Sequence, residues 1–157
     1  MTTIETSRGF SLVEVLIALI IMSVGMLGIA GLYVQSMQAG RTSMLRHHAV
    51  TLAGDIADRI RANPAAGAAY AGAGDPDIDC GTPGTNCDAA DMAANDIALW
   101  KAQALAFLPP MGDGSEQVEV VYTAGNPPTY RITIRWDEPT PDDTVPQYSF
   151  TIPVNPF

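Results

Sequence analysis

Glu14 is the side chain whose surroundings most clearly require a chemical partner, because it lies just inside a long apolar stretch. From Val15 to Val34 the chain carries no charge for twenty residues, and most of them are aliphatic or alanine. A carboxylate in such surroundings costs free energy unless a positive group neutralises it. Phe10 lies four residues earlier, about one helical turn away. If the chain were cut after Gly9, the new α-amine of Phe10 would lie within reach of Glu14, on the same chain or a neighbouring one.

Cys80 and Cys87 are the only cysteines, and they flank a turn rich in glycine and proline. An even count around such a turn favours a disulfide, formed in a compartment that permits oxidation. Closing an eight-residue loop stabilises a fold by ~2.5 kcal/mol in the chain-entropy model. A redox or metal site is the alternative, but the C-x-x-C spacing and a nearby histidine are missing.

Side chains that commonly catalyse reactions are sparse. His47 and His48 are the only histidines, and no serine or cysteine nucleophile is placed beside them by the sequence. We therefore expect helix-surface residues or contacts between subunits, with no enzyme activity and no cofactor. Asp75, Asp77 and Asp79 resemble the first half of a calcium loop, but the central glycine and the later glutamate are absent. We expect no metal, and leave calcium binding at these three residues open.

The uncharged run predicts one membrane-spanning helix. At ~1.5 Å per residue, twenty residues cross the ~30 Å hydrocarbon core of a bilayer. A secretory signal would have a shorter apolar core of ~7–15 residues followed by a cleavage site. Here the run is longer, and the only plausible cleavage site precedes it. The 157 residues therefore suit one domain on a single-pass anchor.

The charge of the chain argues against nucleic-acid binding. Seventeen acidic residues outnumber eight Lys and Arg, which gives a net charge of −9 and no basic stripe. Arg41, Arg46, Arg59 and Arg61 follow the membrane run, whereas residues 75–96 hold acids and no base. Such asymmetry would orient neighbouring subunits, although ordinary solvation explains it equally well.

A single long helix is predicted from about Phe10 to Ala62. Beyond Gln35 its apolar residues recur at steps of three and four, as in a helix with one buried stripe: Leu45, Ala49, Leu52, Ala53, Ile56 and Ile60. Asn63-Pro64 ends it, because proline disfavours a helical residue before it. A globular domain is expected to pack on this second half.

The remaining residues predict a small α+β head. Residues 65–90 show no sustained period and are expected to form a long loop, and residues 91–108 predict a second helix. Strands are predicted at 117–123, 129–137 and 148–154, the middle one with the clearest alternation of apolar and polar residues. We expect an antiparallel sheet of three or four strands with one face buried on the first helix.

The run Gly9-Phe10-Ser11-Leu12-Val13-Glu14-Val15-Leu16-Ile17-Ala18 closely resembles the class III processing site of type IV prepilins and type II secretion pseudopilins. The resemblance implies that the prepilin peptidase/methyltransferase cleaves between Gly9 and Phe10 and that Phe10 is then N-methylated. It also implies that Glu14 serves in subunit docking and that the leader is cytoplasmic.

The expected organisation follows from this resemblance. Residues 1–9 form the leader, 10–34 the transmembrane half of the helix, 35–62 its amphipathic half, and 63–157 the head. The chain would be a single-pass protein of the bacterial inner membrane with its head in the periplasm, and would later reach the pilus at the cell surface.

Later residues resemble a narrower group, the PilV-like type IV pilus modification proteins, which are minor pilins. The likeness rests on Asp96 and Trp100 before Leu108-Pro109, and on a strand that ends in Ile132-Thr133-Ile134-Arg135-Trp136-Asp137. It implies a minor subunit that primes or modifies a type IV pilus in support of motility and adhesion. Its partners would be other minor and major pilins and the inner-membrane assembly machinery.

Two other functions stay open at this stage. A minor pseudopilin of type II secretion would carry the same N-terminal signal, and genomic neighbours or a deletion phenotype would separate the two. From another class, the head would be an adhesive module at a pilus tip, with Tyr70 and the 80–87 loop as exposed contact residues.

Overall fold

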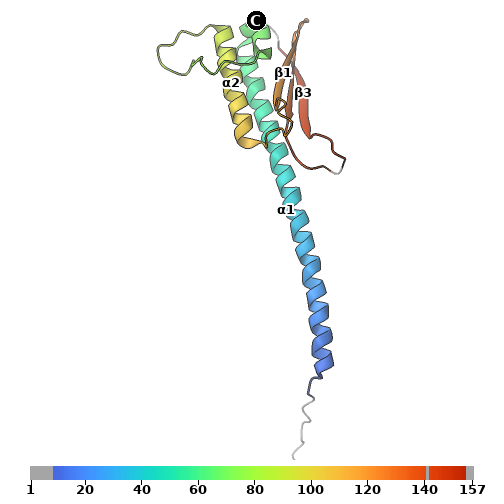
Figure 1. The fold of residues 1–157 in the computed structure, drawn as a ribbon. Coiled ribbons are helices and arrows are strands. Elements are labelled where there is room, and N and C mark those ends of the chain that lie inside the picture. The colour runs from blue at the N-terminus through green and yellow to red at the C-terminus, as the bar shows by residue number, and fades with distance from the viewer. Residues whose placement is uncertain (1–8, 141, 155–157) are drawn as a thin grey trace, which may run out of the picture. The chain divides into compact units, whose positions relative to one another are not determined.

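The computed structural model describes residues 9–140 and 142–154. Its elements follow in the order α1 (Leu12–Ala62), η1 (Pro64–Ala71), α2 (Ala89–Phe107), β1 (Val118–Thr123), β2 (Thr129–Arg135) and β3 (Gln147–Pro153) (Figure 1). The chain forms two compact units that meet in the sequence between Arg41 and Thr42, within α1. Of the predicted leader, residues 1–8 lie outside the described residues.

The first unit consists, in its described part, of the N-terminal portion of α1. Its large apolar side chains are exposed, from Leu12 to Met37. By length and composition this portion is able to cross a membrane. The helix begins two residues after the predicted start at Phe10.

The second unit is built around the other half of α1. Its buried residues repeat at three- and four-residue steps and include every member of the predicted stripe: Leu45, Ala49, Leu52, Ala53, Ile56, Ala57 and Ile60. Asn63 is the first residue after the helix, and Pro64 opens η1. Proline suits the first position of such a turn, because its missing N–H would have no partner there.

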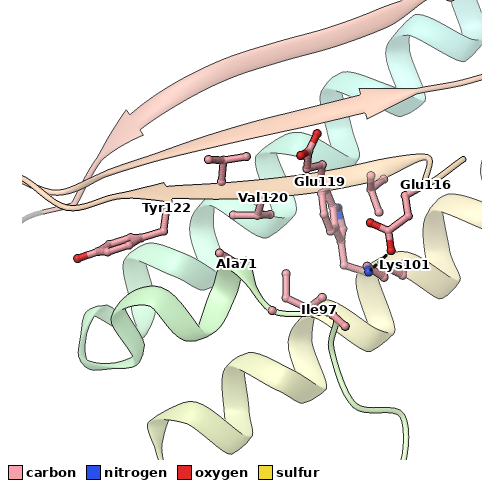
Figure 2. A pocket seen from close by; sticks show the side chains of 12 residues that line it. Ala71, Ile97, Lys101, Glu116, Glu119, Val120 and Tyr122 are labelled. Carbon is pink, nitrogen blue, oxygen red and sulfur yellow. Dashed lines mark hydrogen bonds and ion pairs between the residues drawn. The ribbon is translucent and has the colours of Figure 1, made fainter.

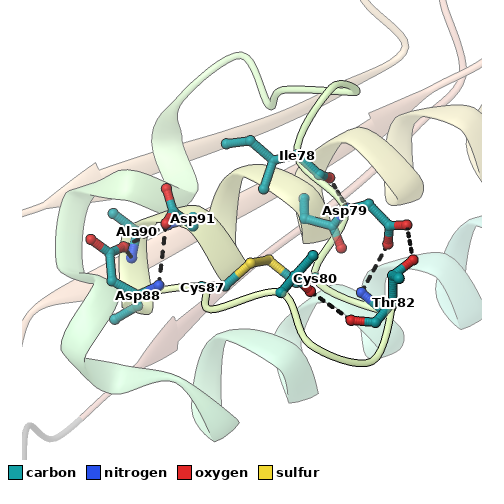
Figure 3. The surroundings of a disulfide bond; sticks show 12 residues. Ile78, Asp79, Cys80, Thr82, Cys87, Asp88, Ala90 and Asp91 are labelled. Atoms are coloured by element: carbon teal, nitrogen blue, oxygen red, sulfur yellow. Dashed lines mark hydrogen bonds between the residues drawn. A yellow bond between two sulfur atoms is a disulfide. The ribbon is translucent and has the colours of Figure 1, made fainter.

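Helix α2 begins at a capping box. The Asp88 carboxylate accepts hydrogen bonds from the backbone N–H groups of Ala90 and Asp91, and the Asp91 carboxylate accepts one from the N–H of Asp88 (Figure 3). This cap places the start at Ala89, two residues before the predicted position. The helix ends at Phe107, before Pro109, and its residues Ala93, Ile97, Trp100 and Ala104 are buried.

The three strands form an antiparallel sheet in the order β1-β2-β3. Its inner face contributes most of the large core side chains from the strands: Val118, Val120, Tyr130, Ile132, Ile134 and Ile152, with Trp136 just past β2. They alternate with polar or exposed residues, as expected for a sheet with one buried face. The predicted α+β fold is therefore confirmed, with three strands among the described residues.

The segment between α1 and α2 differs from the predicted loop. Residues 64–71 form η1, a 3-10 helix interrupted at Gly67, whose φ of +50° is unfavourable for residues with a side chain. The segment forms two short helical turns and not one longer helix, and for this reason its alanine-rich sequence shows no helical period. Further on, Gly74 has a φ of +78° and lies so close to α2 that a Cβ there would come within 2.7 Å of the Ala98 nitrogen.

Candidate functional site

The predicted cleavage junction is exposed and precedes the first helical turn. Gly9 and Phe10 lie outside α1, and both are exposed. The Ser11 carbonyl accepts a hydrogen bond from the Glu14 N–H at 3.1 Å, and the Ser11 hydroxyl accepts one from the Val13 N–H at 3.4 Å. A peptidase must reach an unfolded or extended segment, and this junction offers one directly before the helix.

Glu14 lies in the first turn of α1, where a carboxylate interacts favourably with the helix dipole. It borders one shallow hollow together with Phe10, Val15 and Ala18. The structure thus places Glu14 and Phe10 on the same side of the N-terminal segment.

The polar side chain of Ser23 lies in the apolar portion of α1 and satisfies its hydrogen bond internally. Its hydroxyl donates to the Leu19 carbonyl at 2.7 Å. A serine bonded in this way costs little in a bilayer, because its donor has a partner within the helix. The Ser23 hydroxyl therefore needs no hydrogen-bond partner outside the helix. The Glu14 carboxylate, just before the uncharged run, does need a partner of opposite charge.

The sequence did not predict a polar cluster that joins three elements of the head. Arg59 of α1 forms an ion pair with Asp96 of α2 at 2.9 Å and another with Asp55 at 3.0 Å. The Tyr70 hydroxyl of η1 lies 2.9 Å from an Asp96 carboxylate oxygen and 3.1 Å from the Arg59 carbonyl, so its single proton is shared between two acceptors. The sequence shows Arg59 and Asp96 as charged residues of two predicted helices. No local pattern predicts that they pair, because they lie far apart in the sequence.

This Arg59–Tyr70–Asp96 cluster shifts the acidity of its members. Burial, and then the hydrogen bond to Asp96, raise the pKa of the Tyr70 phenol far above its ordinary value. Partial burial lowers the pKa of Arg59, but hydrogen bonds and charges of Asp96 and Asp55 outweigh it and leave the pKa raised. With both pKa values raised, Tyr70 stays neutral and Arg59 stays charged at physiological pH, as a structural role requires.

Tyr70 was expected to be an exposed contact residue of an adhesive head, and this expectation is wrong. Its side chain is fully buried in the core. The physical reason is η1, which turns Tyr70 inward to the Arg59 carbonyl and Asp96. Without Tyr70, the adhesive hypothesis keeps only the 80–87 loop.

The cysteines form the predicted disulfide, with an S–S distance of 2.04 Å (Figure 3). The bond closes an exposed loop directly before Asp88, the cap of α2. Within the loop, the Asp79 carboxylate accepts hydrogen bonds from the Gly81 N–H and the Thr82 hydroxyl. These bonds, the one from Thr82 first, lower the pKa of Asp79.

The acidic residues before the disulfide are engaged in turns. Asp75 accepts a hydrogen bond from the Asp77 N–H at 2.9 Å, and Asp79 accepts those from Gly81 and Thr82. Among the residues that the structure describes, no three histidine, cysteine or carboxylate side chains are grouped so that they could hold a metal ion.

Both histidines lie on α1, the helix on which the sequence predicted them. His48 stacks on Phe107 of α2, with ring centroids 5.3 Å apart. The His47 carbonyl accepts a hydrogen bond from the Thr51 hydroxyl. Phe107 is about half exposed, whereas the next residue, Leu108, is buried. The turn that ends α2 separates the two side chains.

Two family models match the chain. The prokaryotic N-terminal methylation motif matches residues 6–30, and the model described as type IV pilin Tt1218 matches residues 31–98. Comparisons with curated proteins and with solved structures found no match. The two matched segments adjoin each other and together cover α1, η1 and the first half of α2. The resemblance predicted from the junction at Gly9 is confirmed, whereas the PilV-like subtype stays a prediction.

Proposed function

We propose that this type IV pilin-like chain is a minor pilin that primes or modifies a type IV pilus and so supports motility and adhesion. The observation that carries the proposal is the exposed Gly9-Phe10 junction just before α1, with Phe10 four residues before Glu14 and with the large apolar side chains that follow exposed. The match of residues 31–98 to a type IV pilin supports the same class of subunit.

Maturation in this proposal begins at the junction. The prepilin peptidase/methyltransferase cleaves between Gly9 and Phe10, removes residues 1–9 and methylates the new α-amine of Phe10. That amine then neutralises Glu14 of a neighbouring pilin, because an unpaired carboxylate is costly in apolar surroundings. Glu14 therefore acts in docking, and the chain is a substrate of processing enzymes and not itself an enzyme.

Storage and assembly use the same helix in two environments. Residues 10–34 anchor the chain in the bacterial inner membrane, and residues 63–157 form a periplasmic head on the amphipathic residues 35–62. The exposed apolar side chains between Leu12 and Met37 contact lipid first and other pilins in the filament later. Contacts that join unlike surfaces of successive subunits produce open filaments, as a pilus requires.

A deletion strain of the host bacterium tests the proposal. We expect loss of surface pili and twitching motility, restored by the wild-type gene, with protein secretion unchanged. Loss of secretion with normal motility would instead assign the chain to a type II secretion pseudopilus. Normal motility and normal secretion in the deletion strain would contradict both assignments.

Point variants test the site. Gly9→Ala is expected to leave the leader attached, which mass spectrometry of the N-terminal peptide detects. Glu14→Ala is expected to leave membrane insertion and cleavage intact but to abolish co-purification with other pilins. Ser23→Ala is the matched control, since its hydroxyl is already bonded to the Leu19 carbonyl. Equal assembly of Glu14→Ala and Ser23→Ala would refute the docking role.

A further inference from the structure

Strand β1 is an edge strand, since no other strand among the described residues lies beside its outer backbone groups. The sheet order leaves β1 paired with β2 alone. The Arg135 N–H donates to the Gln117 carbonyl at 2.7 Å, and this pair continues the β1–β2 register. In an antiparallel ladder, hydrogen-bonded pairs alternate with pairs whose N–H and C=O groups point away. The backbone groups of Val118, Val120 and Tyr122 therefore point to the open edge.

A trough with a volume of about 460 Å³ lies along this edge (Figure 2). Five successive residues of β1, Val118 to Tyr122, line it, so the cavity borders the strand backbone and not only one face of the sheet. The opposite wall comes from Ala71 at the end of η1, from the next two residues, Gly72 and Ala73, and from α2. At ~3.3 Å per residue the bordering stretch of β1 is ~17 Å long, enough for an extended segment of about five residues.

The walls of the trough define which side chains an added strand would carry. Val118, Val120, Ile97 and Trp100 lie behind its inner side, each at most 8% exposed, and the small residues 71–73 lie opposite β1. Side chains on the inner side of the added strand should therefore be apolar and of modest size. Figure 2 shows Val120 and Ile97 pointing into this space.

Carboxylates are the most accessible charges of the trough. Glu116 lines it and is ion-paired with Lys101 at 3.0 Å, but its side chain remains 69% exposed. Glu119 is ion-paired with Arg135 at 2.9 Å, and its side chain remains 43% exposed on the outer side of the sheet. Residues of the added strand between the apolar ones would lie beside Glu119, where lysine or arginine is favoured over an acid.

The other edge of the sheet is less suited to pairing. By the same alternation, residues 147, 149, 151 and 153 of β3 point to their open edge. Pro153 has no N–H to donate, and proline at an edge discourages the addition of a strand. Strand β1, by contrast, contains no proline.

We propose that the open edge of β1 binds an extended segment of a partner protein as a fourth strand, with apolar residues inward and lysine or arginine outward. Main-chain hydrogen bonds to Val118, Val120 and Tyr122 supply affinity, and the trough supplies selectivity. A second copy of this chain is disfavoured because the chain carries a net charge of −9. The inference does not depend on the proposed function, since every group involved lies in the head.

The test uses the full chain in detergent micelles and an acetylated, amidated peptide of alternating valine and lysine, roughly seven residues long. Hydrogen exchange followed by NMR is expected to slow roughly tenfold or more at the N–H groups of Val118, Val120 and Tyr122 when the peptide is saturating. Exchange at Glu119 and Val121 should change little, since their N–H groups already bond to β2. Slowing at β3 instead, or at no residue of β1, would overturn the proposal.

Backbone chemistry of the peptide provides a matched control. Methylation of the peptide nitrogens that face β1 keeps the charge and removes the donors, so affinity should fall roughly a hundredfold. Equal affinity of the methylated peptide would mean that it is held by charge alone, which contradicts strand addition. Slow exchange at the same three residues on raising the protein concentration without peptide would assign the edge to a second copy and refute the choice of partner.

Variants of the protein complete the test. Ala71→Phe places a large side chain on the trough wall and should abolish binding, whereas Ala68→Phe, on η1 but outside the trough, should not. Both alanines are exposed, so both variants should fold. Glu119→Lys should weaken binding of the lysine peptide about two- to fivefold and strengthen binding of its glutamate counterpart. Identical binding by all three variants would refute the site.

Discussion

The Arg59–Tyr70–Asp96 cluster should contribute measurably to the stability of the head, and Asp96→Asn tests this contribution. The variant keeps the size of the side chain but removes its charge. It loses the ion pair to Arg59 at 2.9 Å and weakens the hydrogen bond from Tyr70, also 2.9 Å. Arg59 keeps Asp55 as a partner, so its own charge is not stranded.

The magnitude follows from the exposure of the pair. Breaking a fully buried ion pair costs ~3–5 kcal/mol, and a hydrogen bond to a charged group is worth ~1.5–3 kcal/mol. The side chains of Arg59 and Asp96 are 26% and 21% exposed, so water screens part of the interaction. We therefore expect Asp96→Asn to lower the free energy of unfolding by about 2 kcal/mol. For a domain of this size the midpoint of thermal unfolding should fall by about 8 °C.

Circular dichroism during heating of the full chain in detergent measures this shift. Asp58→Asn is the control, because Asp58 pairs with Arg61 on the same helix and the two side chains are 79% and 53% exposed, respectively. Such an exposed pair contributes ~0.5 kcal/mol or less, so its midpoint should fall by no more than about 2 °C. If Asp96→Asn and Asp58→Asn destabilise equally, the cluster does not join α1, η1 and α2 as argued.

Three further outcomes are expected. Replacing Cys80 and Cys87 by serine should lower the free energy of unfolding by ~2.5 kcal/mol, and a reducing agent should then have no further effect on the melting midpoint. Gly74→Ala should cost about 3 kcal/mol in urea unfolding, because its Cβ would meet backbone of α2, whereas Gly84→Ala, with a φ of +99° and open space around it, should cost about 1 kcal/mol. Because the folded state raises the pKa of Tyr70, the unfolded chain releases that proton first, so stability should fall as pH rises above about 10, and Tyr70→Phe should flatten this fall.

The parts of the fold that depend on local patterns could be predicted from the sequence. The strict alternation from Tyr130 to Trp136 predicted the central strand and its buried face. The steps of three and four from Leu45 to Ile60 predicted the stripe of α1 that carries the head. In both cases the period of the backbone decides which side chains are buried, and the sequence carries that period directly.

The missed features depend on contacts between residues distant in the sequence. Burial of Tyr70 requires η1 to fold back on α1 and α2, and an alanine-rich segment carries no period that foretells it. The start of α2 was nearer to prediction, since Asp88 with Asp91 three residues later is a capping pattern that the sequence contains. The trough along β1 is invisible locally, because sheet order decides which strand lies at an edge.

The two tryptophans give the head a pair of independent optical reporters. Trp100 is fully buried between helices and donates to the Leu52 carbonyl at 2.8 Å, whereas Trp136, 2% exposed, lies past β2 and donates to Glu138. Each single Trp→Phe variant would leave one emitter, in the helical layer or beside the sheet. A difference between their emission transitions in urea would reveal whether the helices and the sheet come apart together or in succession.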